Sequence, residues 1–225
     1  MPPDVLLQRL VERVGQSLGP GLTTIAIDGV DGVGKTTFAD ALASRLTDAG
    51  LTVARSSIDG FHHPRATRYR LGKESPEGFF RQSYNLEALR TKLLYPARIG
   101  LPCRLAVFDH RRNRKIVRKP KTIRLPAVLV FDGVFLHRPE LRDEWDLSVF
   151  LEAPFEVTYA RMAERDGSDP DPAALANRRY RDGQLLYFAE ARPQQQADIL
   201  VDCSDWSDPR VIRDAGDPAG NPTGR

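Results

Sequence analysis

The chain has 225 residues, of which 41% are hydrophobic and 28% are charged, and this length and composition favour one domain with a single hydrophobic core. No apolar run approaches the ~20 residues of a membrane-spanning helix, and residues 1–15 lack the apolar block of a signal peptide. The two cysteines, Cys103 and Cys203, have neither metal-site spacing nor a disulfide framework. We therefore expect a cytoplasmic protein without membrane attachment.

The formal net charge of +3 comes from one short segment. Residues 111–124 hold eight Lys or Arg residues and no acid, so the rest of the chain is net acidic. Nucleic-acid platforms interleave aromatic with basic side chains, and this segment has no aromatic residue. A nucleic-acid partner is therefore disfavoured. The segment is instead predicted to be a solvated basic hairpin beside a phosphate-handling site.

The first predicted elements are an amphipathic helix over 4–18 and a strand over 23–27. The strand is short, β-branched and apolar, as a buried parallel strand should be. Phe38, Leu42 and Leu46 then recur at helical spacing until Gly50, which predicts a second helix with a glycine C-cap. A glycine-rich stretch therefore lies between a strand and a helix.

That stretch matches G-x-x-x-x-G-K-[ST], a pattern that average residue usage gives by chance in only roughly 1% of chains this long. Its context predicts a loop whose backbone N–H groups face the phosphates of a nucleotide. We expect Lys35 to reach the β- and γ-phosphate oxygens and the Thr36 hydroxyl to ligate Mg²⁺. The residues predicted to bind ATP are Gly29, Asp31, Gly32, Val33, Gly34, Lys35, Thr36 and Thr37.

Further strands are predicted over 52–58, 127–131, 147–151 and 199–201, with helices over 155–164 and 172–191. Asn85 is expected to cap another helix, and residues 102–117 to form a hairpin or edge excursion. Strands that alternate with helices predict an α/β protein with a parallel sheet, here the three-layer fold of P-loop NTPases. One kinase domain should span 1–203, and residues 204–225, rich in Asp, Pro, Gly and Arg, are predicted to form a disordered tail.

Two acids follow predicted strands, at the edge where α/β sheets bind ligands. Asp132 ends the apolar strand AVLVF, which is the Walker B arrangement for holding Mg²⁺, although a turn residue before Gly133 fits the same pattern. Asp59 follows the strand over 52–58 and is predicted to be the carboxylate that accepts the proton of the attacking hydroxyl. An Asp-Gly turn is the alternative at Asp59.

Residues near these acids are candidates for the acceptor pocket. Phe61 and His62 follow Asp59 and are expected to line it. Phe108, Asp109 and His110 form a second cluster that suits sugar hydroxyls, and a solvent-facing hairpin is equally compatible with that cluster.

Arg161 and Arg165 share one face of a predicted helix and precede a loop rich in Gly, Asp and Pro. Arginines on a mobile lid, here about 161–185, can close over phosphates and neutralise the charge of the transferring group. The alternative is a solvated basic face paired with Glu164 and Asp166.

With these residues in place, the chain resembles the phosphoribulokinase/uridine kinase family of P-loop kinases over about 23–202. The stretches that carry the resemblance are GVDGVGKT, DGFHH, SPEGFFRQSYN, AVFDHR, VFDGVFL, DLSVFLEAPFEVTYARMAERD and ADILVD. The resemblance implies that Asp59 assists the acceptor hydroxyl, that Asp132 ends the metal-binding strand and that Arg161 and Arg165 belong to the lid.

The sequence departs from the uridine kinase pattern at three places. Uridine kinases usually carry an aromatic residue where this chain has His62, a tyrosine where it has Phe108, and a Gln-Tyr pair that helps to read the pyrimidine. The nearest equivalent of that pair is Arg179-Tyr180. The fold and phosphoryl transfer are therefore better supported than uridine as the acceptor.

These features predict an ATP- and Mg²⁺-dependent kinase that phosphorylates a small-molecule alcohol, with a nucleoside as the favoured acceptor. Pantothenate and sugars of the same superfamily are alternatives. A nucleotide-binding regulatory protein is a different class, because a P-loop alone does not prove turnover. A nucleic-acid-acting NTPase recruited by residues 111–124 is a third. The N-K-x-D motif of GTPases and the LSGGQ motif of ABC ATPases are absent from the sequence. The sequence does not decide whether the phosphate donor is ATP or GTP, or whether the protein forms a homo-oligomer.

Overall fold

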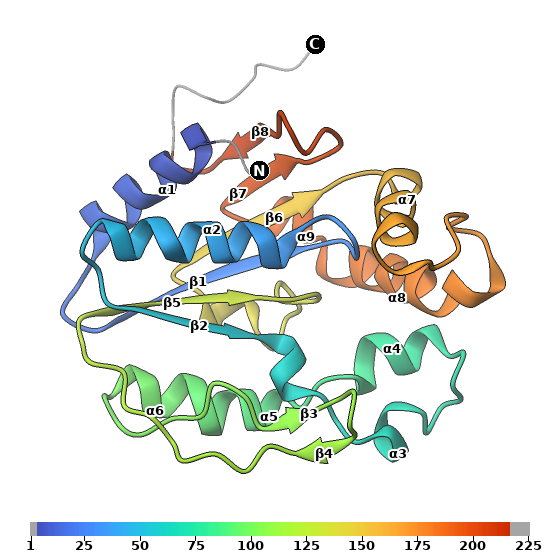
Figure 1. Cartoon of the computed structure of the whole chain (residues 1–225), viewed down its shortest axis with the longest axis horizontal. Coiled ribbons are helices and arrows are strands. Elements are labelled where there is room, and N and C mark those ends of the chain that lie inside the picture. The colour runs from blue at the N-terminus through green and yellow to red at the C-terminus, as the bar shows by residue number, and fades with distance from the viewer. Residues whose placement is uncertain (1–3, 217–225) are drawn as a thin grey trace.

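The computed structural model of the chain describes residues 4–216, which form a six-stranded sheet with helices on both faces (Figure 1). The strand order is β2-β5-β1-β6-β7-β8. Neighbouring strands from β2 to β7 are parallel, and β8 is antiparallel to β7. The strands are β1 (Leu22–Gly29), β2 (Val53–Ser57), β5 (Ala127–Asp132), β6 (Leu147–Glu152), β7 (Ile199–Asp202) and β8 (Arg210–Asp214). The predicted α/β P-loop fold is confirmed.

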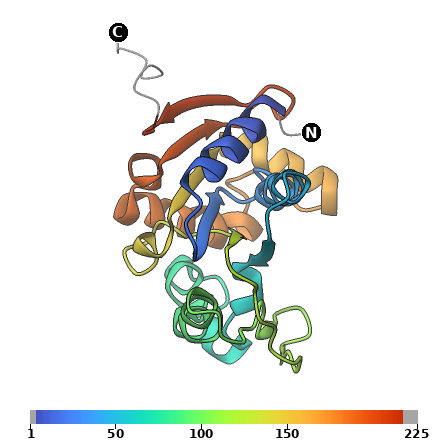
Figure 2. The same ribbon diagram turned by 90° about the vertical axis from the view of Figure 1, so that its left-hand side faces the viewer.

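One face of the sheet is covered by α1 (Asp4–Ser17) and α2 (Lys35–Asp48). Leu6 and Leu10 of α1 and Phe38 and Leu42 of α2 pack against Ile25 and other residues of the central strands. Figure 2 shows these two helices together on one side of the molecule, with the segment that follows β2 on the other. The amphipathic pattern therefore predicted the helix, which ends at Ser17, but only part of its buried face: Leu6, Leu10 and Val14 are buried as expected, whereas Val5 is exposed and Leu7 is buried instead.

The opposite face is covered by short helices and by α8 (Leu175–Ala191). The short elements are η1 (Ile58–Phe61), α3 (Arg65–Arg68), α4 (Pro76–Gln82), α5 (Leu86–Leu89), η2 (Arg90–Leu94) and α6 (Tyr95–Arg98). Asn85 caps α5 as predicted, because its Oδ1 accepts a hydrogen bond from Ala88 N at 2.8 Å. A small hairpin of β3 (Phe108–Asp109) and β4 (Arg114–Lys115) forms within the predicted segment 102–117.

The remaining helices lie near the carboxyl ends of the strands or between them. They are η3 (Arg142–Glu144), α7 (Phe155–Asp166) and α9 (Pro193–Gln196). The segment predicted to form the lid, residues 161–185, therefore consists of the end of α7, the connection 167–174 and the first part of α8. In the part of the chain that the structure describes, no helix is both long and apolar enough to span a membrane.

The prediction of a disordered tail over 204–225 is wrong for its first part. β8 pairs with β7, and Arg13 of α1 donates a hydrogen bond to Asp214 Oδ1 at 2.7 Å. Backbone pairing and this ion pair stabilise a segment that composition alone marks as polar. Residues 217–225 of that prediction lie outside the described residues.

Candidate active site

The glycine-rich loop joins β1 to α2 at the carboxyl edge of the sheet. Gly32 and Gly34 have φ values of +76° and +101°, a backbone region that favours glycine. A Cβ atom at Gly34 would lie 2.6 Å from the Trp206 ring, so this position has no room for a side chain. The Lys35 ammonium donates to Val30 O at 2.7 Å, back across the loop. Backbone N–H groups at a helix N-terminus and a nearby cation favour anions, so this arrangement fits the predicted phosphate-binding role.

Thr36 and Asp132 meet at the end of β5. The Thr36 hydroxyl donates to Asp132 Oδ2 at 2.7 Å, and Asp132 is only 2% exposed. β5 lies beside β1 with Asp132 opposite Ile27, which brings the acid to the loop. A hydroxyl and a carboxylate are the hard oxygen donors that Mg²⁺ prefers, so these residues fit the predicted metal role. Arg55, which the sequence did not indicate, donates to Asp132 Oδ1 at 2.8 Å and balances its charge.

A cavity of about 570 Å³ opens beside the loop and collects most of the predicted site. The predicted residues that line it are Asp31, Gly32, Lys35, Thr36, Asp59, His62, His110, Asp132, Arg165, Arg179 and Tyr180. The Asp59 side chain, in η1, is 62% exposed. Burial raises the pKa of Asp31, and the Lys35 ammonium partly offsets that rise. The groups predicted to bind phosphate and an exposed carboxylate thus border one cavity.

Aromatic rings form part of the same cavity. The His62 and His110 rings stack with centroids 4.4 Å apart, and the Tyr84 ring lies 4.5 Å from that of His62. Burial lowers the pKa of His62 to about 4, so its imidazole is neutral at pH 7. Phe79 packs edge-on against Tyr180, with centroids 5.0 Å apart. Tyr84 and Phe79 lie in the stretch SPEGFFRQSYN, which carries part of the family resemblance but to which no site role was assigned.

Arg179 also lies at the cavity, but its guanidinium is committed to the protein. It is 5% exposed, donates to Lys73 O at 2.6 Å and lies 5.1 Å from the Tyr69 ring centroid. Burial lowers the pKa of Arg179. The predicted Arg179-Tyr180 pair therefore borders the cavity, and its arginine also holds the connection between α3 and α4.

Three residues predicted to contact the acceptor lie elsewhere. Phe61 is fully buried and packs against Phe131 with ring centroids 6.3 Å apart, because the η1 turn directs it into the core. Phe108 is buried outside the cavity lining. Asp109 accepts a hydrogen bond from Arg112 N at 3.0 Å, which fixes the tip of the β3–β4 hairpin.

The eight residues predicted to bind ATP fall into two groups, those that line the cavity and those that do not. Gly29, Val33, Gly34 and Thr37 do not line the cavity. Val33 is fully buried in the core between α2 and the sheet. These four residues belong to the loop through their backbone, and backbone N–H groups are what a P-loop offers to phosphates.

The two predicted lid arginines point in different directions. Arg161 donates to Cys203 O at 2.9 Å and to Ser204 O at 2.8 Å, so it ties α7 to the β7–β8 connection and does not line the cavity. Arg165 lines the cavity and pairs with Asp166 at 2.8 Å. Among the two, Arg165 alone has the position of a lid arginine.

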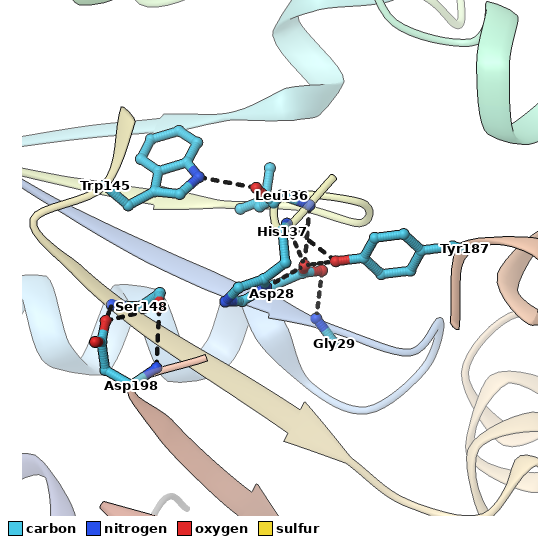
Figure 3. A network of polar contacts seen from close by, with 8 residues as sticks. All are labelled: Asp28, Gly29, Leu136, His137, Trp145, Ser148, Tyr187 and Asp198. Carbon is cyan, nitrogen blue, oxygen red and sulfur yellow. Dashed lines mark hydrogen bonds and ion pairs between the residues drawn. The ribbon is translucent and has the colours of Figure 1, made fainter. Parts of the chain in front are cut away.

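A polar network that the sequence reasoning missed joins the loop to α8 (Figure 3). Asp28 is fully buried, and its Oδ2 accepts from Leu136 N at 2.9 Å, from His137 Nδ1 at 2.8 Å and from the Tyr187 hydroxyl at 2.5 Å. Its Oδ1 accepts from Gly29 N at 2.7 Å. An acid inside an apolar strand was the available signal, because such a carboxylate must be satisfied by nearby donors.

A second contact from α8 holds the loop itself. Gln184 Oε1 accepts from Asp31 N at 2.8 Å. The Gln184 side chain is buried, and Tyr187 one turn further on bonds Asp28. The helix that follows the lid connection is therefore hydrogen-bonded to the end of β1, through Asp28, and to the loop, through Asp31.

Comparisons with known proteins agree with this geometry. The model of the Phosphoribulokinase / Uridine kinase family matches residues 24–170, more than half of the chain. A uridine kinase of Leuconostoc citreum (strain KM20) is 26% identical over 148 residues, which are 63% of this chain and 67% of the relative. A uridine kinase of Shewanella frigidimarina (strain NCIMB 400) is 25% identical over 189 residues, 79% of this chain and 85% of the relative.

Solved structures share the architecture. One from Bacillus stearothermophilus, described as a possible uridine kinase, has a TM-score of 0.69 at 23% identity and covers 86% of this chain and 96% of its own. A proposed fructose transport system kinase from Silicibacter sp. TM1040 has a TM-score of 0.62 at 26% identity, with coverage of 86% and 93%. Relatives with different named acceptors therefore share this fold.

Proposed function

Because the chain belongs to the phosphoribulokinase/uridine kinase family, we propose that it transfers the γ-phosphate of ATP to a hydroxyl group of a small molecule. The observation that carries the proposal is one cavity bordered by Lys35, Thr36, Asp59 and Asp132. Phosphoryl transfer needs phosphate binding, charge neutralisation and an oriented acceptor at one place, and these residue types serve those needs.

On the donor side, the backbone N–H groups of the loop hold the phosphates and Lys35 contacts their β- and γ-oxygens. Thr36 and Asp132 are the residues that would hold Mg²⁺, which neutralises charge on the phosphate oxygens when bound. Arg165 extends that neutralisation from α7. The role of Arg55 is to hold the Asp132 carboxylate in place, with its other oxygen bonded to Thr36.

On the acceptor side, Asp59 accepts the proton of the attacking hydroxyl. The hydroxyl oxygen forms a bond to the γ-phosphorus while the bond between that phosphorus and the β,γ-bridging oxygen breaks, and ADP leaves. The Asp59 side chain is 62% exposed, and it acts mainly by orienting the hydroxyl, because catalysis of phosphoryl transfer is mostly positioning and charge stabilisation.

Two acceptor classes have support from particular observations. A nucleoside is the acceptor named for the uridine kinase relatives. The rings of His62, Tyr84 and Phe79 line the cavity and offer faces on which a base can stack. A sugar fits the fructose transport system kinase, whose structure is 26% identical. Pantothenate belongs to the same group of alternatives, and a regulatory nucleotide-binding protein is the alternative without turnover.

The test is ADP release by the purified protein with ATP, Mg²⁺ and a panel of nucleosides, pantothenate and sugars. We expect release that depends on one acceptor and is lost in Lys35→Ala and strongly reduced in Asp59→Asn. If ATP binds but no panel member stimulates ADP release, the result would favour a regulatory nucleotide-binding protein. Unaltered release by Lys35→Ala would contradict the P-loop assignment.

A further inference from the structure

Arg68, at the end of α3, is a buried cation in the acceptor cavity. It is 8% exposed and lines the cavity. Among residues 4–216, its guanidinium makes neither a hydrogen bond nor an ion pair, and its buried Nε has no partner. Its guanidinium lies over the Tyr69 ring, whose centroid is 5.3 Å from Cζ. Buried charges in proteins are ordinarily paired, because desolvation without a partner is costly.

The other cations at the cavity differ from Arg68 in this respect. Arg165 pairs with Asp166, Lys35 bonds Val30 O, and Arg179 bonds Lys73 O. Arg179 also contacts the same Tyr69 ring as Arg68, so two positive charges lie close together. Their mutual repulsion adds to the cost of leaving Arg68 without an anion.

We propose that Arg68 binds an anionic group, a carboxylate or a phosphate, on the acceptor. The proposal rests on the kinase function above and names its substrate class: a hydroxy acid or a phosphorylated alcohol in place of a neutral nucleoside. A guanidinium suits both anions because its planar N–H groups can bind two oxygens at once.

The position of Arg68 fits an acceptor that spans the cavity. The Asp59 carboxylate raises the pKa of His62 and the Arg68 guanidinium lowers it, so both charges act on one ring. The acceptor can therefore place its hydroxyl at Asp59 and its anion at Arg68, with His62 beside it. Repulsion between Asp59 and the anion directs the negative group away from the γ-phosphate and toward Arg68.

The first experiment separates a ligand role from a structural one. Removal of a buried, unpaired charge should leave the melting temperature of Arg68→Met equal to or above that of the wild type. With Mg·AMPPNP saturating the P-loop, inorganic phosphate is then titrated into the wild type, Arg68→Met and Arg68→Lys. Charge-assisted hydrogen bonds predict a phosphate dissociation constant roughly tenfold or more weaker in Arg68→Met, with Arg68→Lys between.

The surface variant Arg142→Met is the matched control, because that side chain pairs with the exposed Asp143 at 3.7 Å and does not border the cavity. It should bind phosphate like the wild type. Equal phosphate affinity in the wild type and Arg68→Met, or a clear fall in the melting temperature of Arg68→Met, would overturn the proposal. Failure to bind AMPPNP at all would instead count against the kinase function itself.

The second experiment measures ADP release with acceptors that differ only in the anionic group. The pairs are glycerate with glycerol, pantothenate with panthenol, and ribulose 5-phosphate with ribulose, with uridine beside them. We expect turnover with the charged member of one pair, and a KM at least tenfold higher in Arg68→Met. The carboxylate and phosphate arms identify the anion. Turnover of uridine at equal KM in the wild type and Arg68→Met would refute the proposal.

Discussion

The buried carboxylate of Asp28 offers a sharp test of how the glycine loop is held. In Asp28→Asn the amide oxygen can keep the position of Oδ2, where donors from Leu136, His137 and Tyr187 converge. The amide nitrogen must then face Gly29 N, which donates to Oδ1 in the native protein. Two donors would therefore oppose each other at a site without access to water.

The magnitude follows from the bonds that change. Loss of a hydrogen bond to a charged group costs about 1.5–3 kcal/mol, and a buried donor left without an acceptor adds about 1–3 kcal/mol. The free energy of unfolding should therefore fall by about 3–5 kcal/mol, a range typical of a broken buried charge network. Tyr187→Phe removes one donor and leaves the carboxylate with the others, so it should cost about 1.5–3 kcal/mol.

Urea unfolding followed by circular dichroism gives these differences from the transition midpoints. Ser148→Ala is the control for ATP affinity: in Figure 3 its hydroxyl donates to Asp198 Oδ2 at 2.8 Å and accepts from Asp198 N at 3.1 Å, away from the glycine loop. This variant should lower the free energy of unfolding but leave ATP affinity unchanged. A cost below about 1 kcal/mol for Asp28→Asn, or a larger cost for Tyr187→Phe, would refute the reasoning.

Four further outcomes follow from the site. Lys35→Ala should abolish turnover while unfolding stays near native, since the ammonium makes one hydrogen bond, to Val30 O, and a long ion pair with Asp31 at 4.0 Å among the described residues; a lowered melting temperature would expose a structural role. Asp59→Asn should lower kcat by about 10²-fold with ATP affinity intact, measured with the acceptor that supports turnover; a normal kcat would leave Asp59 as a turn residue. Arg165→Ala should lower kcat more than it raises KM for ATP. Arg161→Ala should mainly lower the free energy of unfolding, because the carbonyls of Cys203 and Ser204 lose their donor. The reverse pattern would contradict the assignment of Arg165 to the lid and of Arg161 to the structure. With His62 at a pKa of about 4 in the folded state and 6.5 as its ordinary value, the unfolded state binds more protons between these values. Stability should therefore fall as pH drops from 6.5 to 4, by at most roughly 3 kcal/mol, and His62→Gln should flatten that slope in urea titrations at each pH.

The residues of the donor site were predictable because they are contiguous. A P-loop is a local structure in which fixed spacing between Gly29 and Thr36 sets the backbone, and Asp132 follows from an apolar strand that ends in an acid. For these residues, the local sequence pattern was enough to predict where they lie in the fold. The acceptor side comes from η1, α3, α4 and α8, whose approach to one another depends on packing that no short window of sequence encodes.

The errors have the same physical origin. Phe61 lies between Asp59 and His62 in sequence, but a tight 3₁₀ turn points successive side chains in different directions, and its ring enters the core. Arg161 and Arg165 do share a helix face, yet the β7–β8 connection offers carbonyls to the first of them. The missed strand β8 gains its order from the edge of β7, a contact between residues that a polar composition cannot reveal.

The polar groups of the two halves of the cavity are satisfied differently. Within the protein, Lys35 has Val30 O and Thr36 has Asp132, so the donor-side groups hold one another in place before any phosphate contacts them. Such preorganisation favours a common donor over fine discrimination. On the acceptor side, the Asp59 side chain is 62% exposed and Arg68 has no hydrogen-bonding partner among the described residues. An acceptor with an anion that pairs with Arg68 should bind more tightly than one that leaves the guanidinium without an anion. The reason is that this charge is already largely removed from water in the folded protein. Selectivity among acceptors should therefore reside at Arg68, and phosphate transfer at the loop.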